Sequence, residues 1–306
     1  MGAGTDLSLK IKRVRTDFRW SMLMKPAPKI RGVRDIIDIP YDEDGEKWHF
    51  LDIHRPEVIN KALPAFVYIH GGGWSTVDKT FFHHYCRCIA QKGFVVFNID
   101  YRLAPEHRYP AQIEDIISAV NWVMENGEKY GADTSKLIVG GDSAGAHLSA
   151  TLGCLCTNEA YAHESGYAPR LKNIKISALV LLCGAYDIKS AVKVRVPAIG
   201  KYIKGRLSID ALRDLAKTGE WVEVSPLLHI TGDFPPSFVT DSYDDGLFEE
   251  SVAMDKVLET SGVYHRTIFY GKKDGAFIHD FQILYFLPVY KKCMNEIVKF
   301  INEILE

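Results

Sequence analysis

The sequence LIVGGDSAG at residues 137–145 decides the fold class that we expect for this chain of 306 residues. Three apolar residues lead toward Gly141, and Ser143 then stands between two glycines in a G-x-S-x-G pattern. Small residues follow from position 144, as is typical of a helix that packs closely against its neighbours. This order predicts a strand that turns sharply into a helix and presents the serine hydroxyl above the edge of a sheet. The glycines are needed because side chains would clash across so tight a turn.

A second glycine-rich stretch, HGGGW at residues 70–74, precedes the first in the chain. Its backbone N–H groups can point toward an oxygen that becomes negatively charged during a reaction. The N–H of Ala144, at the start of the predicted helix, has the same capacity and is favoured by the helix dipole. Each pattern alone is weak evidence. Together, and in this order, the two stretches indicate acyl transfer by a serine nucleophile.

The composition is that of an ordinary soluble globular protein, with 47% hydrophobic and 25% charged residues. The formal charge of −2 gives no reason to expect nucleic acid or an anionic membrane as a partner. The first residues lack the apolar core of a secretory signal, and no apolar stretch is long enough to span a bilayer. We therefore expect a cytoplasmic location. The six cysteines are then expected to be free thiols, and their spacing favours no metal site.

Most of the chain alternates between apolar runs and segments with helical spacing. The apolar runs predict strands at 65–69, 94–99, 137–139, 177–182, 237–240 and 266–269. Helical spacing predicts helices at 80–91, 113–124, 144–155, 249–260 and 289–305. Ahead of these, residues 36–39 and 48–53 flank an Asp-Glu-Asp-Gly turn, which predicts an antiparallel hairpin. The alternation predicts a mostly parallel sheet that is covered by helices on both faces.

Two regions depart from this alternation and are predicted to contribute to a cap. Residues 1–30 predict a helix that ends near Pro26 and Pro28. Nine Lys and Arg residues between positions 10 and 34 predict a solvated basic face, with a basic collar for an acidic substrate as the alternative. The stretch 188–234 interrupts the strands on the carboxyl side of the sheet, where it is well placed to cover an active site. The alternative for this stretch is an extra helical connection without a functional role.

A serine hydroxyl is a poor nucleophile until a base removes its proton, so the fold must bring a histidine to Ser143. In chains with this kind of turn, an acid and then the histidine follow the serine in sequence. His279 meets this requirement, because it comes after the last predicted strand and before the C-terminal helix. The acid is expected just after the penultimate strand, where Asp241, Asp244 and Asp245 are available. We favour Asp245, with Asp244 as the alternative.

Three stretches together resemble the hormone-sensitive-lipase-like family of α/β-hydrolases, namely HGGGW at 70–74, DYRLAPE at 100–106 and GDSAG at 141–145. The resemblance runs from about residue 65 to the C-terminus. It implies a single α/β-hydrolase domain over residues 1–306, with cap elements from 1–40 and 188–234, and no cofactor.

The resemblance also implies roles for individual residues. It places the oxyanion hole at the backbone N–H groups of Gly72, Gly73 and Ala144. It gives His70 a supporting role beneath the glycine loop. Asp142 and Trp74 are candidate substrate-binding residues, and for Trp74 an anchor of the glycine loop is an equal alternative. Independently of the resemblance, Arg102 and Glu106 are close enough in sequence to pair, and we expect them to form a structural clamp below that loop, with substrate contact as the alternative.

The chain departs from the family pattern at two places. Residues 245–247 read Asp-Gly-Leu where the family commonly has Asp-Pro-Leu. Residues 279–281 read His-Asp-Phe where the family often has His-Gly-Phe. Neither departure removes an atom that the proposed chemistry needs.

These observations predict a carboxylic-ester hydrolase that acts through an acyl-enzyme, with Ser143, His279 and Asp245 as its triad. The partner is a small-molecule ester with a short acyl chain, and a homodimer is left open. An amidase or aryl-formamidase that uses the same triad is the first alternative. A non-catalytic small-ligand receptor of the same fold is the second. His279 argues against the receptor, since such proteins tend to lose the base.

Overall fold

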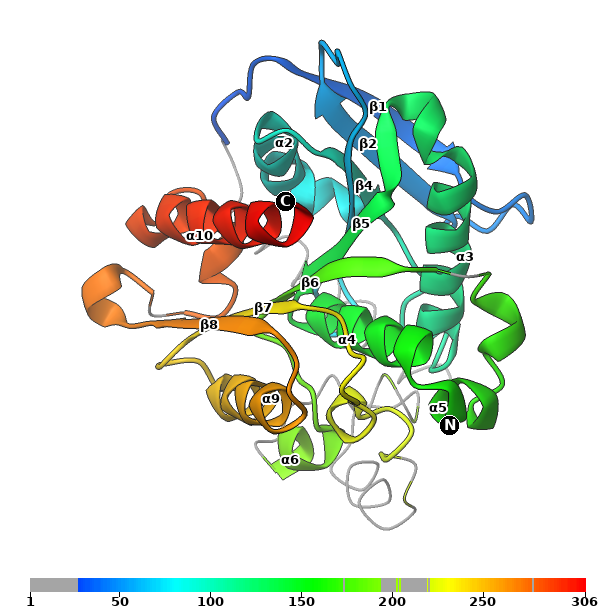
Figure 1. The fold of residues 1–306 in the computed structure, drawn as a ribbon, viewed down its shortest axis with the longest axis vertical. Coiled ribbons are helices and arrows are strands. Elements are labelled where there is room, and N and C mark those ends of the chain that lie inside the picture. The colour runs from blue at the N-terminus through cyan, green and yellow to red at the C-terminus, as the bar shows by residue number, and fades with distance from the viewer. Residues whose placement is uncertain are drawn as a thin grey trace, which may run out of the picture.

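A computed structural model describes residues 27–172, 174–193, 202, 204, 219, 221–276 and 278–306. Its strands form an eight-stranded sheet in the order β1-β2-β4-β3-β5-β6-β7-β8 (Figure 1). The strands are β1 Val33–Pro40, β2 Phe50–Pro56, β3 Leu63–Ile69, β4 Val95–Ile99, β5 Ala132–Asp142, β6 Ile176–Leu182, β7 Ser237–Ser242 and β8 His265–Tyr270. The main helices are α2 His83–Gln91, α3 Ala111–Asn126, α4 Ala144–Thr157, α5 Glu159–Glu164, α6 Ile188–Lys193, α9 Phe248–Thr260 and α10 Pro288–Leu305.

The sheet is antiparallel at one edge and parallel from β4 onwards. β1 and β2 form the predicted hairpin, and β2 pairs with β4 in the antiparallel sense. The remaining neighbours, from β4 through β3 to β8, are all parallel. The predicted mostly parallel sheet is therefore confirmed.

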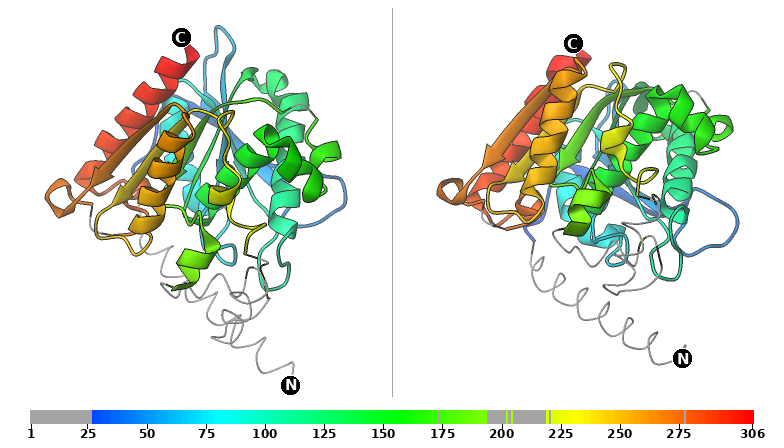
Figure 2. Two further views of the ribbon diagram at one scale, coloured as in Figure 1. Left: turned by 60° about the horizontal axis from the view of Figure 1, so that its bottom comes forward. Right: turned by 90° about the horizontal axis from the view of Figure 1, so that it is seen from below.

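Strand β3 shows why the sheet is covered on both faces. Alternate side chains of a strand point to opposite faces, and here both sets are apolar. Ala65, Val67 and Ile69 join one buried cluster, which includes side chains of α3, α4 and α9. Phe66 and Tyr68 join a second buried cluster with side chains of α2 and α10. Both views of Figure 2 show α9 and α10 on opposite sides of β7 and β8.

The predicted strands and helices between residues 65 and 305 are confirmed, although several bounds differ. The largest difference is at β5, which begins at Ala132 and so extends five residues before the predicted 137–139. Residues 133–136 are polar, so the apolar pattern gave no sign of them. Pro64 nevertheless pairs with Asp133, ahead of a register shift in the ladder between β3 and β5.

The predicted cap falls largely outside the described residues. The helix expected at 1–30 and most of its basic positions belong to that undescribed part. Within 188–234 the structure describes α6, a short 3₁₀ helix at Pro226–Leu228 and a few neighbouring residues. Residues 33–40 of the first predicted cap element form β1 of the sheet. For the rest, the division into one domain with a cap from 1–40 and 188–234 stays a prediction.

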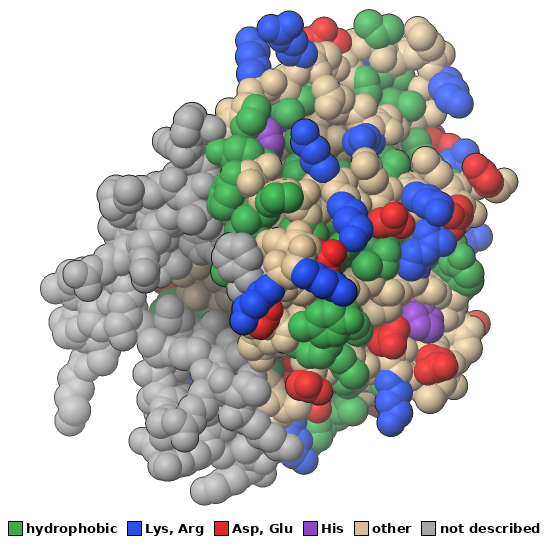
Figure 3. Space-filling model, turned by 90° about the vertical axis from the view of Figure 1, so that its left-hand side faces the viewer, with side chains coloured by type: hydrophobic (Ala, Val, Ile, Leu, Met, Phe, Trp, Pro, Cys, Tyr) green, Lys and Arg blue, Asp and Glu red, His purple; other side chains and the backbone are tan. Residues whose placement is uncertain are grey.

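The described residues show mixed surface charge, no membrane-spanning helix and free cysteine thiols. Figure 3 shows one face on which the Lys and Arg side chains are interspersed with Asp and Glu. Within these ranges no helix combines the length and the apolar character that crossing a membrane requires. All six cysteines are free thiols, and four of them are buried.

Candidate active site

Ser143 occupies the turn between β5 and α4 in a strained backbone conformation. Its φ of 51° and ψ of −113° lie outside the regions that L-residues ordinarily adopt. The neighbouring glycines allow this turn to sit close to β3. A Cβ on Gly141 would lie 2.0 Å from the carbonyl oxygen of Ile69, and one on Gly145 would lie 1.9 Å from it. The predicted strand–turn–helix around the serine is thus present, and its tightness depends on both glycines.

The structure brings Ser143, His279 and Asp245 together from three separate loops. His279 Nε2 lies 2.8 Å from the Ser143 hydroxyl oxygen. On the other side of the ring, Nδ1 lies 2.6 Å from Oδ2 of Asp245. With the Nδ1–H donating to the carboxylate, the Nε2 lone pair is left to accept the serine proton. The arrangement is able to activate an alcohol for attack on a carbonyl group.

Asp245 is buried and fixed, whereas the alternative acid faces elsewhere. Asp245 Oδ1 accepts the Leu247 backbone N–H at 2.8 Å, and its side chain is only 2% exposed. Asp244 instead forms an ion pair with Lys272 at 3.1 Å and is one third exposed. The turn after β7 therefore directs Asp245, and not Asp244, toward His279.

Several nearby carboxyl groups change the pKa of the His279 imidazole. Desolvation by itself would lower the pKa of the imidazole, but Asp280, Asp245 and Asp241 together raise it above its ordinary value. Burial opposes ionisation of Asp245, yet the hydrogen bond from His279 holds the pKa of that carboxyl below its usual range. The site thus favours an ionised acid beside a histidine that holds a proton readily.

Asp142 supports the glycine loop from below. Its Oδ1 accepts the Tyr68 hydroxyl at 2.5 Å and the Gly71 backbone N–H at 3.0 Å. Burial and the nearby Asp280 raise the pKa of Asp142 to about 8. Because the residue is 1% exposed, the geometry gives it a supporting position, and its contact with substrate stays a prediction.

The glycine loop itself is shaped by positive φ angles. Gly72 has a φ of +100°, and a Cβ there would lie 2.2 Å from the carbonyl oxygen of Thr76. Gly73 follows with a φ of 59°. These two residues and Ala144 lie on the two segments that Asp142 joins through its hydrogen bond from Gly71. The assignment of Gly72, Gly73 and Ala144 to that hole stays a prediction.

Trp74 anchors the end of the glycine loop. Its ring is 2% exposed and stacks on Tyr202, with the ring centroids 4.5 Å apart. The indole N–H donates to His147 Nδ1 at 3.3 Å, and His147 Nε2 in turn contacts the Val224 carbonyl at 2.7 Å. Burial lowers the pKa of His147 to about 4, so this histidine is a neutral packing residue. The role of Trp74 in lining an acyl pocket stays a prediction.

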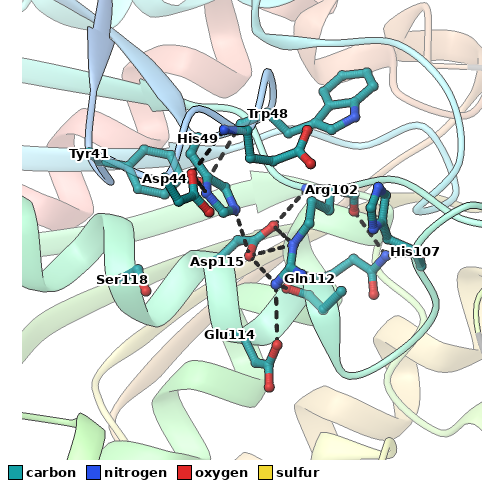
Figure 4. A network of polar contacts seen from close by, with 12 residues as sticks. Tyr41, Asp44, Trp48, His49, Arg102, His107, Gln112, Glu114, Asp115 and Ser118 are labelled. Carbon is teal, nitrogen blue, oxygen red and sulfur yellow. Dashed lines mark hydrogen bonds and ion pairs between the residues drawn. The ribbon is translucent and has the colours of Figure 1, made fainter.

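The stretch at 100–106 fastens the loop beneath the glycine segment. The Tyr101 hydroxyl donates to the His70 carbonyl at 2.8 Å, and the two rings stack with centroids 4.3 Å apart. Figure 4 shows that Arg102 is held by α3, through Asp115 at 2.6 Å and Glu114 at 3.2 Å. The expected pairing of Arg102 with Glu106 was therefore wrong, because α3 brings two acidic side chains to the guanidinium.

Asp280 is a site residue that the sequence reasoning did not single out. It follows His279 directly, is 3% exposed, and has a φ of 62°. Its Oδ1 lies 3.4 Å from His279 Nε2 and accepts the Cys183 thiol at 3.2 Å. The departure from His-Gly-Phe was the available signal, since a glycine there fits the same left-handed backbone.

The chain is similar to known proteins in sequence and in fold. A model of the BD-FAE family matches residues 51–258. Esterase LipC of Mycobacterium tuberculosis (strain ATCC 25618 / H37Rv) is 27% identical over 237 residues, which are 76% of this chain and 57% of LipC. This chain thus spans little more than half the length of that relative.

Two solved structures have the same fold. Esterase B from Lactobacillus rhamnosis superposes with a TM-score of 0.86 at 20% identity, over 98% of this chain and 96% of that one. A hyperthermophilic esterase from the archeon Pyrobaculum calidifontis has a TM-score of 0.73 at 27% identity, over 98% of this chain and 95% of its own. The resemblance to the hormone-sensitive-lipase-like α/β-hydrolases is confirmed. By its fold and by the match over residues 51–258, the chain belongs to the BD-FAE family of α/β-hydrolases.

Proposed function

We propose that this protein is a carboxylic-ester hydrolase with Ser143 as its nucleophile. The observation that carries the proposal is the continuous hydrogen-bonded series from Ser143 through His279 to Asp245. A strained serine turn is characteristic of nucleophiles that must be exposed at a sheet edge. The names of the relatives, which are esterases, support the same reaction class.

Each step of the reaction has a residue to perform it. As the Ser143 oxygen attacks the ester carbonyl, His279 Nε2 takes its proton and then gives it to the leaving alcohol. Asp245 stabilises the imidazolium that forms between these transfers. Backbone N–H groups of Gly72, Gly73 and Ala144 donate to the carbonyl oxygen as it becomes negative. Water then attacks the acyl-enzyme by the same route and releases the acid.

The substrate that we propose is a small ester with a short acyl chain, held under a cap built from residues ahead of β1 and from 188–234. Two described contacts support a cap over the glycine loop. Tyr202 stacks on Trp74, and the Val224 carbonyl contacts His147. Both Tyr202 and Val224 are fully or almost fully buried. Residues of the 188–234 stretch therefore pack against Trp74, which directly follows the predicted oxyanion-hole residues Gly72 and Gly73.

Active-site labelling tests the proposal. The purified protein is treated with a short-chain p-nitrophenyl phosphonate, and the adduct is located by peptide mass spectrometry. We expect one adduct per chain, on Ser143, together with turnover of p-nitrophenyl butyrate. If the protein forms no adduct and does not turn over the ester, the proposal is contradicted and the non-catalytic receptor is favoured. Faster turnover of an N-formyl arylamine than of the ester would favour the aryl-formamidase.

A further inference from the structure

Asp280 places a second carboxyl group beside the histidine of the proposed triad. Its Oδ1 lies 3.4 Å from Nε2, the ring nitrogen that faces Ser143, whereas Asp245 contacts Nδ1 on the far side of the ring. The Asp280 side chain is almost completely buried. Its other side-chain polar contact among the described residues is with the Cys183 thiol at 3.2 Å, which supplies a weak donor and no charge.

A buried carboxylate is unfavourable unless a positive group compensates it. Here the neighbouring imidazolium is the cation in direct contact. When His279 is neutral, Asp280 gains by holding a proton of its own, so the two side chains compete for protons as a coupled pair. Burial raises the pKa of Asp280, which fits this competition. The imidazolium–carboxylate state and the imidazole–carboxylic acid state differ only in where the proton resides.

The other titratable groups around His279 do not cancel the coupling between the protonation of Asp280 and that of His279. They are Asp142 at the end of β5, Cys183 after β6, Asp241 within β7 and Asp245 after β7. Burial raises the pKa of the Cys183 thiol, so this group stays neutral. Burial likewise raises the pKa values of Asp142 and Asp241 to about 8. Among the described residues, Asp280 is the carboxyl group that forms an ion pair with Nε2, at 3.4 Å.

We propose that Asp280 is a positioning residue whose charge stabilises protonated His279 from the Nε2 side and so sets the pH at which His279 becomes a base. The catalytic consequence rests on the proposed function. Asp280 makes and breaks no bond in it: the proton passes from the serine oxygen to Nε2 and from there to the leaving alcohol. Through space, a carboxylate at this place favours the imidazolium during both transfers. The same charge keeps the resting histidine protonated to higher pH.

Two substitutions remove the charge while keeping the backbone. Asp280→Asn preserves the side-chain size, and asparagine tolerates a positive φ well. Asp280→Gly removes the side chain and fits the φ of 62° without strain. Asp244→Asn is the matched control, because it removes a neighbouring but exposed carboxylate that is paired with Lys272.

The first readout is an NMR titration of the His279 ring, which requires no turnover. We expect the midpoint to fall by about one pH unit or more in Asp280→Asn and Asp280→Gly, as for loss of a close opposite charge. Asp244→Asn should leave the midpoint within a few tenths of a unit. An unmoved midpoint in both Asp280 variants would overturn the proposal.

The second readout is the pH dependence of kcat/KM for p-nitrophenyl butyrate. The acid limb should shift to lower pH by the same amount in both Asp280 variants. A purely structural role would lower the plateau and leave the limb where it is, which would also overturn the proposal. If the wild-type protein neither turns over the ester nor reacts with the phosphonate, the proposed function fails, while the NMR titration still decides the role of Asp280.

Discussion

At the scale of single residues, Ser143 is both the proposed nucleophile and a residue with a strained backbone conformation. Ser143→Ala should lower ester hydrolysis at least about 1,000-fold, since nothing else replaces the attacking oxygen. It should leave stability nearly unchanged, because alanine at a φ of 51° keeps the strain. Ser143→Gly should also be inactive but more stable than Ser143→Ala by about 1 kcal/mol, because glycine relieves the strain. Initial rates and urea unfolding check both expectations, and substantial residual activity would identify a different nucleophile.

The two adjacent aspartates after β7 should differ sharply in their effect on turnover. Asp245→Asn should reduce kcat by about 1,000-fold or more, because the amide favours the wrong tautomer of His279. Asp244→Asn should change kcat less than about twofold, since exposed ion pairs contribute little. Steady-state kinetics on p-nitrophenyl butyrate measures both. A severe loss in Asp244→Asn with a silent Asp245→Asn would reverse the assignment.

The choice between these aspartates shows where sequence reasoning reached its limit. Chain order and the strand pattern were enough to find Ser143 and His279 as candidates. Which of two consecutive carboxylates faces inward depends on the turn after β7, where the Asp245 side chain binds the Leu247 N–H. Asp280 was missed for a related reason. Its burial against His279 and Cys183 follows from the path of the loop, which no periodicity encodes.

At the scale of secondary-structure elements, the serine turn depends on glycines that lie against β3. Gly145→Ala should destabilise the protein by about 3 kcal/mol or more, because its Cβ would meet the rigid Ile69 backbone at 1.9 Å. Gly153→Ala, later in the same helix, is the matched control. Its Cβ would meet the Leu179 and Phe234 side chains at 2.8 and 2.9 Å, and side chains are able to adjust.

Urea unfolding of the two variants measures the difference. Alanine also has the higher helix propensity, which offsets part of the cost at Gly153 by about 1 kcal/mol. Gly153→Ala should therefore be clearly more stable than Gly145→Ala. Equal losses in the two variants would mean that contact with the β3 backbone does not control the turn.

At the scale of the whole molecule, sheet order explains how distant residues meet. Ser143 follows β5, Asp245 follows β7 and His279 follows β8, and these strands are parallel neighbours in the order β5-β6-β7-β8. Parallel strands bring all of their carboxyl ends to one edge. The sequence was sufficient to predict this convergence, because strand–helix alternation leaves few other topologies.

The same whole-molecule view identifies a pH-dependent link between the β1–β2 hairpin and α3. His49, in the connection between the two strands, lies between two carboxylates (Figure 4). Its Nδ1 is 2.9 Å from Asp44 and its Nε2 is 3.1 Å from Asp115, the residue that also holds Arg102. Desolvation lowers the pKa of His49, but Asp115 and Asp44 outweigh it and raise the pKa above the ordinary value. The folded protein therefore binds this proton more tightly than the unfolded chain does.

It follows that the stabilisation by His49 depends on pH in a definite direction. It is fully present below the unfolded-state pKa of about 6.5 and is lost as the pH rises through the higher folded-state pKa. His49→Gln removes the titration, so the difference in unfolding free energy between wild type and variant should be largest near pH 6 and shrink toward pH 9. Urea unfolding across this range measures it, with the exposed His163→Gln on α5 as the control. A difference that stays constant with pH would show that the two carboxylates do not hold a proton on His49.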